Sequence, residues 1–215
     1  EIVPVAAVSR TLQSNALVYL PAKYDSSKRK KWPLLVWLHG ASGRGSNLEM
    51  VKRYGPPRVA ESTGDFPFVI VSPQCPPGQL WNDAPAIVAL TDQMERAFRI
   101  DRKKVCLTGL SMGGGGAWFV ASQFPERYAA VVPMCGPTQP KDWAAGLRNV
   151  KIWCFHGDRD ELIPVERSKD MVQAIRKLGG KPKLTILKGK PHDITREYED
   201  DRVYKWMLKQ KRKRV

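Results

Sequence analysis

Residues Gly109 to Gly113 read Gly-Leu-Ser-Met-Gly and match the pattern GxSxG, which can expose a serine hydroxyl for nucleophilic attack. An apolar run at 105–108 precedes the pattern, and a run of small residues with helical character follows it. A strand, a sharp turn and a helix are the setting that such a nucleophile needs. We therefore predict Ser111 as a nucleophile rather than as part of a structural turn.

A serine hydroxyl needs a base to take its proton, and the chain has three histidines. His39 and His156 each end an apolar run and precede a glycine, so they suit bracing of loops by hydrogen bonds. His192 lies later, in a loop after the run 184–187, and follows all the candidate acids. The chain order serine, acid, histidine favours His192 as the base over a surface histidine.

The acid that orients the base should follow a strand between the serine and the histidine. Three carboxylates stand there, at Asp158, Asp160 and Glu161. An acid held against the imidazole fixes its tautomer and stabilises the imidazolium. Charge alone does not separate the three, and an acidic loop paired with Arg159 is the alternative.

Negative charge developing on a substrate oxygen needs two convergent backbone N–H donors. We predict the N–H of Met112 as one donor and the N–H of Ala41, in the glycine-rich loop 39–45, as the other. The alternative, a phosphate cradle, lacks both GxxxxGK[ST] and GxGxxG. The four cysteines contain no CxxC pair. We therefore expect no cofactor and no metal.

The elements that must position these residues alternate along the chain. Apolar runs that predict strands lie at 16–20, 34–38, 68–71, 105–108, 130–133, 152–155 and 184–187. Helical periodicity follows at 87–98, 113–124, 172–178 and 198–209. This alternation predicts an α/β fold: a single domain over 1–215, with a mainly parallel central sheet and helices on both faces. The printed sequence has no long apolar run for a membrane span, and its first residues do not resemble a leader, so cytoplasmic and exported locations both stay open.

The net charge of +15 has two concentrations, at 28–31 and 209–214. Neither is interleaved with aromatic residues or set in a nucleic-acid motif, so we expect no specific nucleic-acid partner. A solvated loop and a frayed tail at 209–215 explain the charge, and a polyanion-binding surface is the alternative. The oligomeric state stays open.

Six blocks in order resemble the α/β-hydrolase superfamily, in particular small serine esterases of the phospholipase/carboxylesterase, dienelactone-hydrolase-like and predicted-peptidase kinds. The blocks are LLVWLHGASGRGSN, VIVSPQCPPGQLW, VCLTGLSMGGGGAW, FPERYAAVVPMCG, IWCFHGDRDELIPVERS and PHD. The resemblance covers about residues 10–210 and implies a cofactor-independent ester hydrolase with no sizeable cap domain. In such proteins the acid is the fifth residue of HGxxDxxxP, which here is Asp160. Two residues depart from the usual pattern, Ser42 within the donor loop and Arg44 after its second glycine.

The resemblance implies cleavage of small or polymer-borne carboxylic esters through an acyl-enzyme. Trp81, in a proline-rich loop, is the candidate for a wall that contacts the acyl or aryl group. The alternatives are an acetyl or feruloyl esterase acting on polysaccharide, a serine peptidase, and a non-enzymatic polyanion-binding protein.

Overall fold

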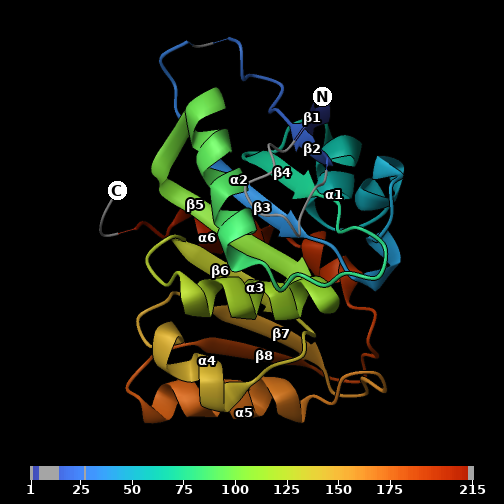
Figure 1. Cartoon of the computed structure of the whole chain (residues 1–215), viewed down its shortest axis with the longest axis vertical. Helices are drawn as coiled ribbons and strands as arrows, with labels where there is room; N and C mark the ends of the chain where they lie inside the picture. Colours follow the sequence, from blue (N-terminus) through green and yellow to red (C-terminus); the bar gives the residue numbers. More distant parts are fainter. Residues whose placement is uncertain (1, 5–14, 27, 213–215) are drawn as a thin grey trace.

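The computed structural model describes residues 2–4, 15–26 and 28–212. Within this part of the chain, one sheet contains eight strands in the order β1-β2-β4-β3-β5-β6-β7-β8 (Figure 1). Strand β2 pairs antiparallel with both of its neighbours, β1 and β4, and the remaining pairs are parallel. The strands are β1 (Ile2–Pro4), β2 (Asn15–Tyr19), β3 (Trp32–Leu38), β4 (Val69–Pro73), β5 (Ile100–Leu110), β6 (Ala130–Met134), β7 (Trp153–Gly157) and β8 (Lys183–Leu187).

The central strands are apolar on both faces because helices cover both faces. Along β3, Leu34 and Val36 belong to one hydrophobic core, whereas Leu35 and Trp37 belong to the other. All four side chains are fully buried. Successive side chains of a strand point to opposite faces, so a strand between two cores reads as a continuous apolar run.

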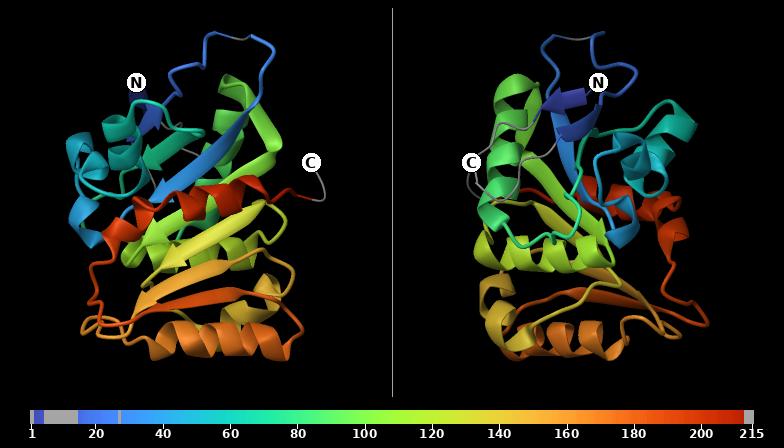
Figure 2. Two further views of the ribbon diagram at one scale, coloured as in Figure 1. Left: turned by 180° about the vertical axis from the view of Figure 1, so that it is seen from behind. Right: turned by 45° about the vertical axis from the view of Figure 1, so that its right-hand side comes forward.

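Of the α-helices in the described ranges, four lie on one face of the sheet and two on the other (Figures 1 and 2). The helices are α1 (Pro56–Thr63), α2 (Ala84–Ala97), α3 (Met112–Gln123), α4 (Pro140–Leu147), α5 (Glu166–Lys177) and α6 (Asp201–Leu208). Helices α2 to α5 cover the first core, and α1 and α6 cover the second. No helix in the described ranges is both long and apolar enough to cross a membrane.

The predicted alternation of strands and helices is confirmed, including the mainly parallel sheet. Each of the seven predicted apolar runs overlaps a strand. The elements β1, α1 and α4 were not predicted: β1 has three residues, and α1 and α4 bury mainly prolines and alanines, which do not mark an apolar face. No inserted domain interrupts the alternation within the described residues, as predicted.

The C-terminal residues differ from the prediction of a frayed tail over 209–215. The backbone N–H of Arg212 donates to the carbonyl oxygen of Lys103 at 2.9 Å, and the Arg212 side chain is 8% exposed. The chain is therefore held against the start of β5 as far as Arg212, and the prediction is wrong for 209–212. Residues 213–215 lie outside the described part.

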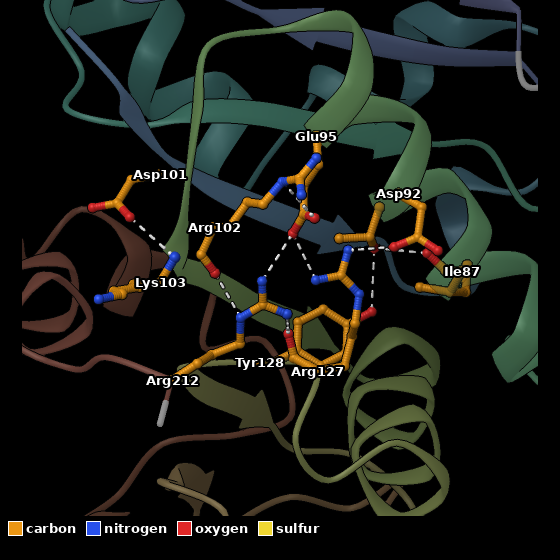
Figure 3. A network of polar contacts seen from close by, with 10 residues as sticks. Ile87, Asp92, Glu95, Asp101, Arg102, Lys103, Arg127, Tyr128 and Arg212 are labelled. Carbon is orange, nitrogen blue, oxygen red and sulfur yellow. Dashed lines mark hydrogen bonds and ion pairs between the residues drawn. The ribbon is translucent and has the colours of Figure 1, made fainter. Parts of the chain in front are cut away.

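The cause is a buried carboxylate on α2 that needs cations. Glu95 Oε1 lies 2.7 Å from Nη1 of Arg127 and 3.1 Å from Nη2 of Arg212 (Figure 3). The second guanidinium nitrogen of Arg127 binds Asp92 at 2.7 Å. Because an unpaired buried charge is costly, the acid and the two arginines fix one another.

Candidate active site

Ser111 occupies the sharp turn between β5 and α3. Its backbone has φ 55° and ψ −117°, a conformation that non-glycine residues rarely adopt. The backbone N–H of Ser111 donates to the carbonyl oxygen of Met134 at 2.9 Å, which anchors the turn to β6. A strained turn of this kind projects the hydroxyl beyond the carboxyl ends of the strands.

The two glycines that flank the serine are required by close backbone approach. A Cβ at Gly109 would overlap the carbonyl oxygen of Gly113, and a Cβ at Gly113 would overlap the carbonyl oxygen of Leu38. The overlaps are with backbone atoms, which cannot rotate away as a side chain can. The glycines of the GxSxG pattern therefore allow the start of α3 to pack directly against the backbone at the end of β3.

The structure brings together Ser111, His192 and Asp160 from three separate loops. Ser111 Oγ lies 2.8 Å from His192 Nε2, and His192 Nδ1 lies 2.7 Å from Asp160 Oδ2. Asp160 accepts only, so Nδ1 carries the proton and the serine hydroxyl donates to Nε2. The Asp160 side chain is fully buried, whereas His192 is 20% exposed. A buried acid, an oriented imidazole and a hydroxyl are therefore linked in series.

The three candidate acids occupy different positions. Asp160 Oδ1 accepts the backbone N–H groups of Leu162 and Ile163, at 3.0 and 2.8 Å, while Oδ2 faces the imidazole. Asp158 is exposed and accepts the N–H of Gly189 at 2.6 Å, and Glu161 is exposed. Of the three, Asp160 is the one that contacts His192, as the resemblance implied.

The two predicted oxyanion donors lie in segments next to the serine. Met112 is the first residue of α3, so its N–H has no acceptor within the helix. Ala41 likewise begins a short 3₁₀ helix, 41–43. The preceding Gly40 is so close to the nucleophile that a Cβ built on it would lie 3.5 Å from Ser111 Cβ. Both backbone donors are thus available at this edge of the sheet.

His39 supports this donor loop from below. The backbone N–H of Cys75 donates to His39 Nε2 at 3.0 Å, so Nδ1 carries the proton and donates to Gly40 O at 2.7 Å. The pKa of His39 is lowered to about 4, mainly by burial; the Gly40 hydrogen bond opposes this shift, and the charge of Arg44 contributes to it. A neutral imidazole therefore fixes the loop through both ring nitrogens.

Trp81 lies beneath the site rather than on its rim. Its indole N–H donates to the carbonyl oxygen of His39 at 2.9 Å, and the side chain is 3% exposed. A Cβ at Gly116 would overlap Trp81 Cβ, so the residue packs tightly against α3. The structure therefore does not place Trp81 as a wall for the acyl group; it supports the donor loop.

One residue that shapes the donor loop, Tyr54, carries no signal in the sequence. Its hydroxyl accepts the N–H of Gly40 at 2.9 Å and lies 3.3 Å from Ser42 Oγ. Burial raises the pKa of Tyr54, so the hydroxyl keeps its proton. The unusual Ser42 thus directs its side chain to a tyrosine. Arg44, the other departure, donates to the carbonyl oxygens of Ala41 and Gln79, at 3.4 and 3.3 Å.

Three side chains come close enough to bind a metal, namely Cys135, Asp160 and His192, whose ligand atoms lie within 4.8 Å of one another. Each is already engaged: the Cys135 thiol donates to His192 O at 3.4 Å, and the other two form the linked pair described above. Burial also raises the pKa of the Cys135 thiol well above its ordinary value. A metal would have to displace these bonds, so we assign the atoms to the serine site.

Comparisons with known proteins show which family the chain belongs to. A family model described as the dienelactone hydrolase family matches residues 78–212, more than half of the chain. The bifunctional acetylxylan esterase/xylanase XynS20E of Neocallimastix patriciarum is 29% identical over 165 residues, which are 74% of this chain and 23% of that protein.

Solved structures show the same fold. A thermostable esterase has a TM-score of 0.82 at 27% identity, covering 94% of this chain and 60% of that one. A ferulic acid esterase has a TM-score of 0.70 at 22% identity, covering 96% of each chain. The chain thus spans less than a quarter of the xylanase-containing relative and three fifths of the thermostable esterase. From the match of the family model and the shared architecture, the chain belongs to the dienelactone hydrolase family and has the α/β-hydrolase fold.

Proposed function

We propose that the chain is a serine hydrolase that cleaves carboxylic esters through a covalent acyl-enzyme. The observation that carries the proposal is the continuous link from Ser111 Oγ to His192 to Asp160, at 2.8 and 2.7 Å. A hydroxyl hydrogen-bonded to an imidazole, which is in turn hydrogen-bonded to a buried carboxylate, is the arrangement that activates serine as a nucleophile.

In the first half of the reaction, Ser111 Oγ bonds to the ester carbonyl carbon, and its proton passes to His192 Nε2. The carbonyl oxygen becomes an oxyanion, which the N–H groups of Ala41 and Met112 stabilise. Asp160 stabilises the imidazolium through Nδ1–H. When the tetrahedral intermediate collapses, the bond to the alcohol oxygen breaks and His192 returns the proton to the leaving alcohol.

In the second half, water attacks the acyl-enzyme while His192 accepts one of its protons. Collapse of the second tetrahedral intermediate breaks the bond to Ser111 Oγ, which recovers its proton from His192. The products are a carboxylic acid and the free enzyme. The residues named supply every proton transfer.

We further propose acetyl esters carried on a polysaccharide as the substrate class. The support is the similarity to the acetylxylan esterase/xylanase and the absence, within the described residues, of an inserted domain over the serine. The apolar Leu80 and Leu162 are also largely exposed in the loops after β4 and β7. An open site accommodates an ester on a bulky polymer.

The test is Ser111→Ala with p-nitrophenyl acetate, compared with the wild type. Turnover should fall by at least roughly 10⁴-fold while the thermal unfolding midpoint stays unchanged. A variant that retains wild-type turnover would overturn the serine mechanism. For the substrate class, acetylated xylan should be deacetylated faster than methyl ferulate is hydrolysed or a peptide amide is cleaved; a reversed order would replace the proposed class with a feruloyl ester or peptide.

A further inference from the structure

A second histidine contacts the carboxylate of the proposed triad. His156 lies near the end of β7 and is fully buried. Its Nε2 lies 3.1 Å from Asp160 Oδ2 and 2.8 Å from the carbonyl oxygen of Ile163. A carbonyl oxygen and a carboxylate oxygen both accept, so Nε2 must carry the proton and donate to them.

The other face of the same ring is held by α5. His156 Nδ1 lies 2.7 Å from Ser168 Oγ, and Ser168 is fully buried. With the proton on Nε2, the neutral ring accepts at Nδ1, so the Ser168 hydroxyl donates to it. Cys154 Sγ lies 3.3 Å from the same hydroxyl oxygen and supplies a donor to it. One buried chain of donors therefore runs from Cys154 through Ser168 and His156 to Asp160.

The carboxylate of Asp160 consequently receives donors on both of its oxygens. Oδ1 accepts two backbone N–H groups, and Oδ2 accepts His192 at 2.7 Å and His156 at 3.1 Å. The longer contact shares the oxygen that orients the reactive imidazole. Removing it would leave Oδ2 restrained by His192 alone.

We propose that His156 is a positioning residue: its Nε2–H, oriented by Ser168, holds Asp160 Oδ2 where that oxygen accepts from His192. The proposal rests on the proposed serine mechanism. This positioning role differs from a purely structural one, in which the hydrogen bond from His156 to Ile163 O only holds the loop. A purely structural role would affect folding and not the rate of the chemical step. The N–H group, and not the bulk of the ring, is the part that acts.

The experiment compares four variants by steady-state kinetics with p-nitrophenyl acetate and by thermal unfolding. His156→Leu removes the N–H and keeps much of the volume, and His156→Gln replaces the ring with an amide that carries an N–H near the same place. Ser168→Ala removes the donor that fixes the tautomer. Thr91→Val is the matched control, because Thr91 is an equally buried hydroxyl on α2 that donates to Ile87 O and lies outside the chain of donors.

We expect His156→Leu to lower kcat roughly 10- to 100-fold with KM changed less than about twofold. His156→Gln should recover most of the loss, Ser168→Ala should lose about 3- to 10-fold, and Thr91→Val should keep the wild-type kcat. If His156→Leu does not fold, the glutamine and Ser168 variants decide the question.

Two results would overturn the proposal: wild-type kcat in the Leu or Ser168 variants, or equal losses of kcat in His156→Leu and His156→Gln. The second would show that packing of the ring matters and its N–H does not. Failure of the serine mechanism gives a different pattern, because Ser111→Ala would then remain active whatever the His156 variants do.

Discussion

Two buried carboxylates lie at opposite ends of the parallel strands, and they are bound by different kinds of partner. Asp160 follows the carboxyl end of β7 and is bound by backbone N–H groups and two imidazoles. Glu95 lies near the end of α2, beside the start of β5, and is bound by guanidinium groups of Arg127 and Arg212 (Figure 3). Oε2 of Glu95 also lies 3.6 Å from Nε of Arg102. Each carboxylate thus has a partner at both oxygens, but only the second is neutralised by guanidinium groups.

The difference shows how one fold separates chemistry from stability. Neutral donors fix the direction of the Asp160 oxygens, and in the proposed mechanism this leaves the negative charge free to stabilise an imidazolium. Guanidinium groups compensate the charge of Glu95 permanently and tie α2 to the C-terminal residues. The first arrangement therefore suits proton transfer, and the second suits a structural clamp.

The largest expected effect comes from Asp160→Asn. The amide cannot hold the Nδ1–H tautomer of His192 as the carboxylate does, so kcat with p-nitrophenyl acetate should fall about 10⁴-fold. Glu95→Gln is the matched change at the other carboxylate and should leave kcat within about twofold of wild type. Similar losses of kcat in the two variants would show that the two carboxylates do not differ in their roles.

The converse effect on stability should follow from Glu95→Ala. Removing the acid leaves Arg127 and Arg212 close together without their shared partner, which should cost about 3–5 kcal/mol of unfolding free energy. Urea unfolding followed by tryptophan fluorescence measures this. Glu61→Ala, at an exposed ion pair with Lys52, is the control and should cost less than about 0.5 kcal/mol. Equal costs for the two variants would refute the clamp.

The pH dependence of stability should arise in part from His39, which supports the donor loop. Its pKa is lowered by burial from 6.5 to about 4, so the unfolded chain binds a proton at a higher pH than the folded one. The stability that His39 contributes is complete above pH 6.5 and is lost as the pH falls from 6.5 to about 4, to a total of roughly 3 kcal/mol.

Urea unfolding of the wild type and of His39→Gln at several pH values in this window isolates the contribution. The variant should be less stable at neutral pH and should lose less stability on acidification. Parallel curves for the two proteins would show that His39 does not carry the effect.

A smaller loss is expected from Arg212→Ala. The side chain donates to the carbonyl oxygens of Arg102 and Arg127 and pairs with Glu95, and burial lowers its pKa. Loss of these contacts should lower the unfolding free energy by about 2 kcal/mol without changing kcat. In a double-mutant cycle with Glu95→Ala, the two losses should not add, and additive losses would show that the residues act independently.

Local pattern accounted for the sheet and for much of the site. Strands buried on both faces, such as β3, are predicted by continuous apolar runs. The GxSxG turn is predicted because an apolar run precedes it and a helical run follows it. The choice of Asp160 over Asp158 needed the resemblance, because neighbouring carboxylates differ only in where the loop turns them.

The parts that escaped prediction depend on contacts between distant residues. Arg212 binds Glu95, which lies 117 residues earlier in the sequence, and a basic C-terminal segment does not by itself indicate a buried acidic partner on α2. Trp81 was expected on a rim because it follows prolines, yet its indole N–H finds the carbonyl of His39 42 positions earlier. His156 was expected to brace a loop; its contact with Asp160 follows from the exact path of that loop after β7.

The most direct test of the proposed serine mechanism is covalent labelling with a fluorophosphonate probe, mapped by peptide mass spectrometry. If His192 activates Ser111, the wild type should be labelled at Ser111 alone, and His192→Ala should react at least roughly 10³-fold more slowly. Labelling at another residue, or labelling of Ser111 at the same rate without the imidazole, would contradict the account.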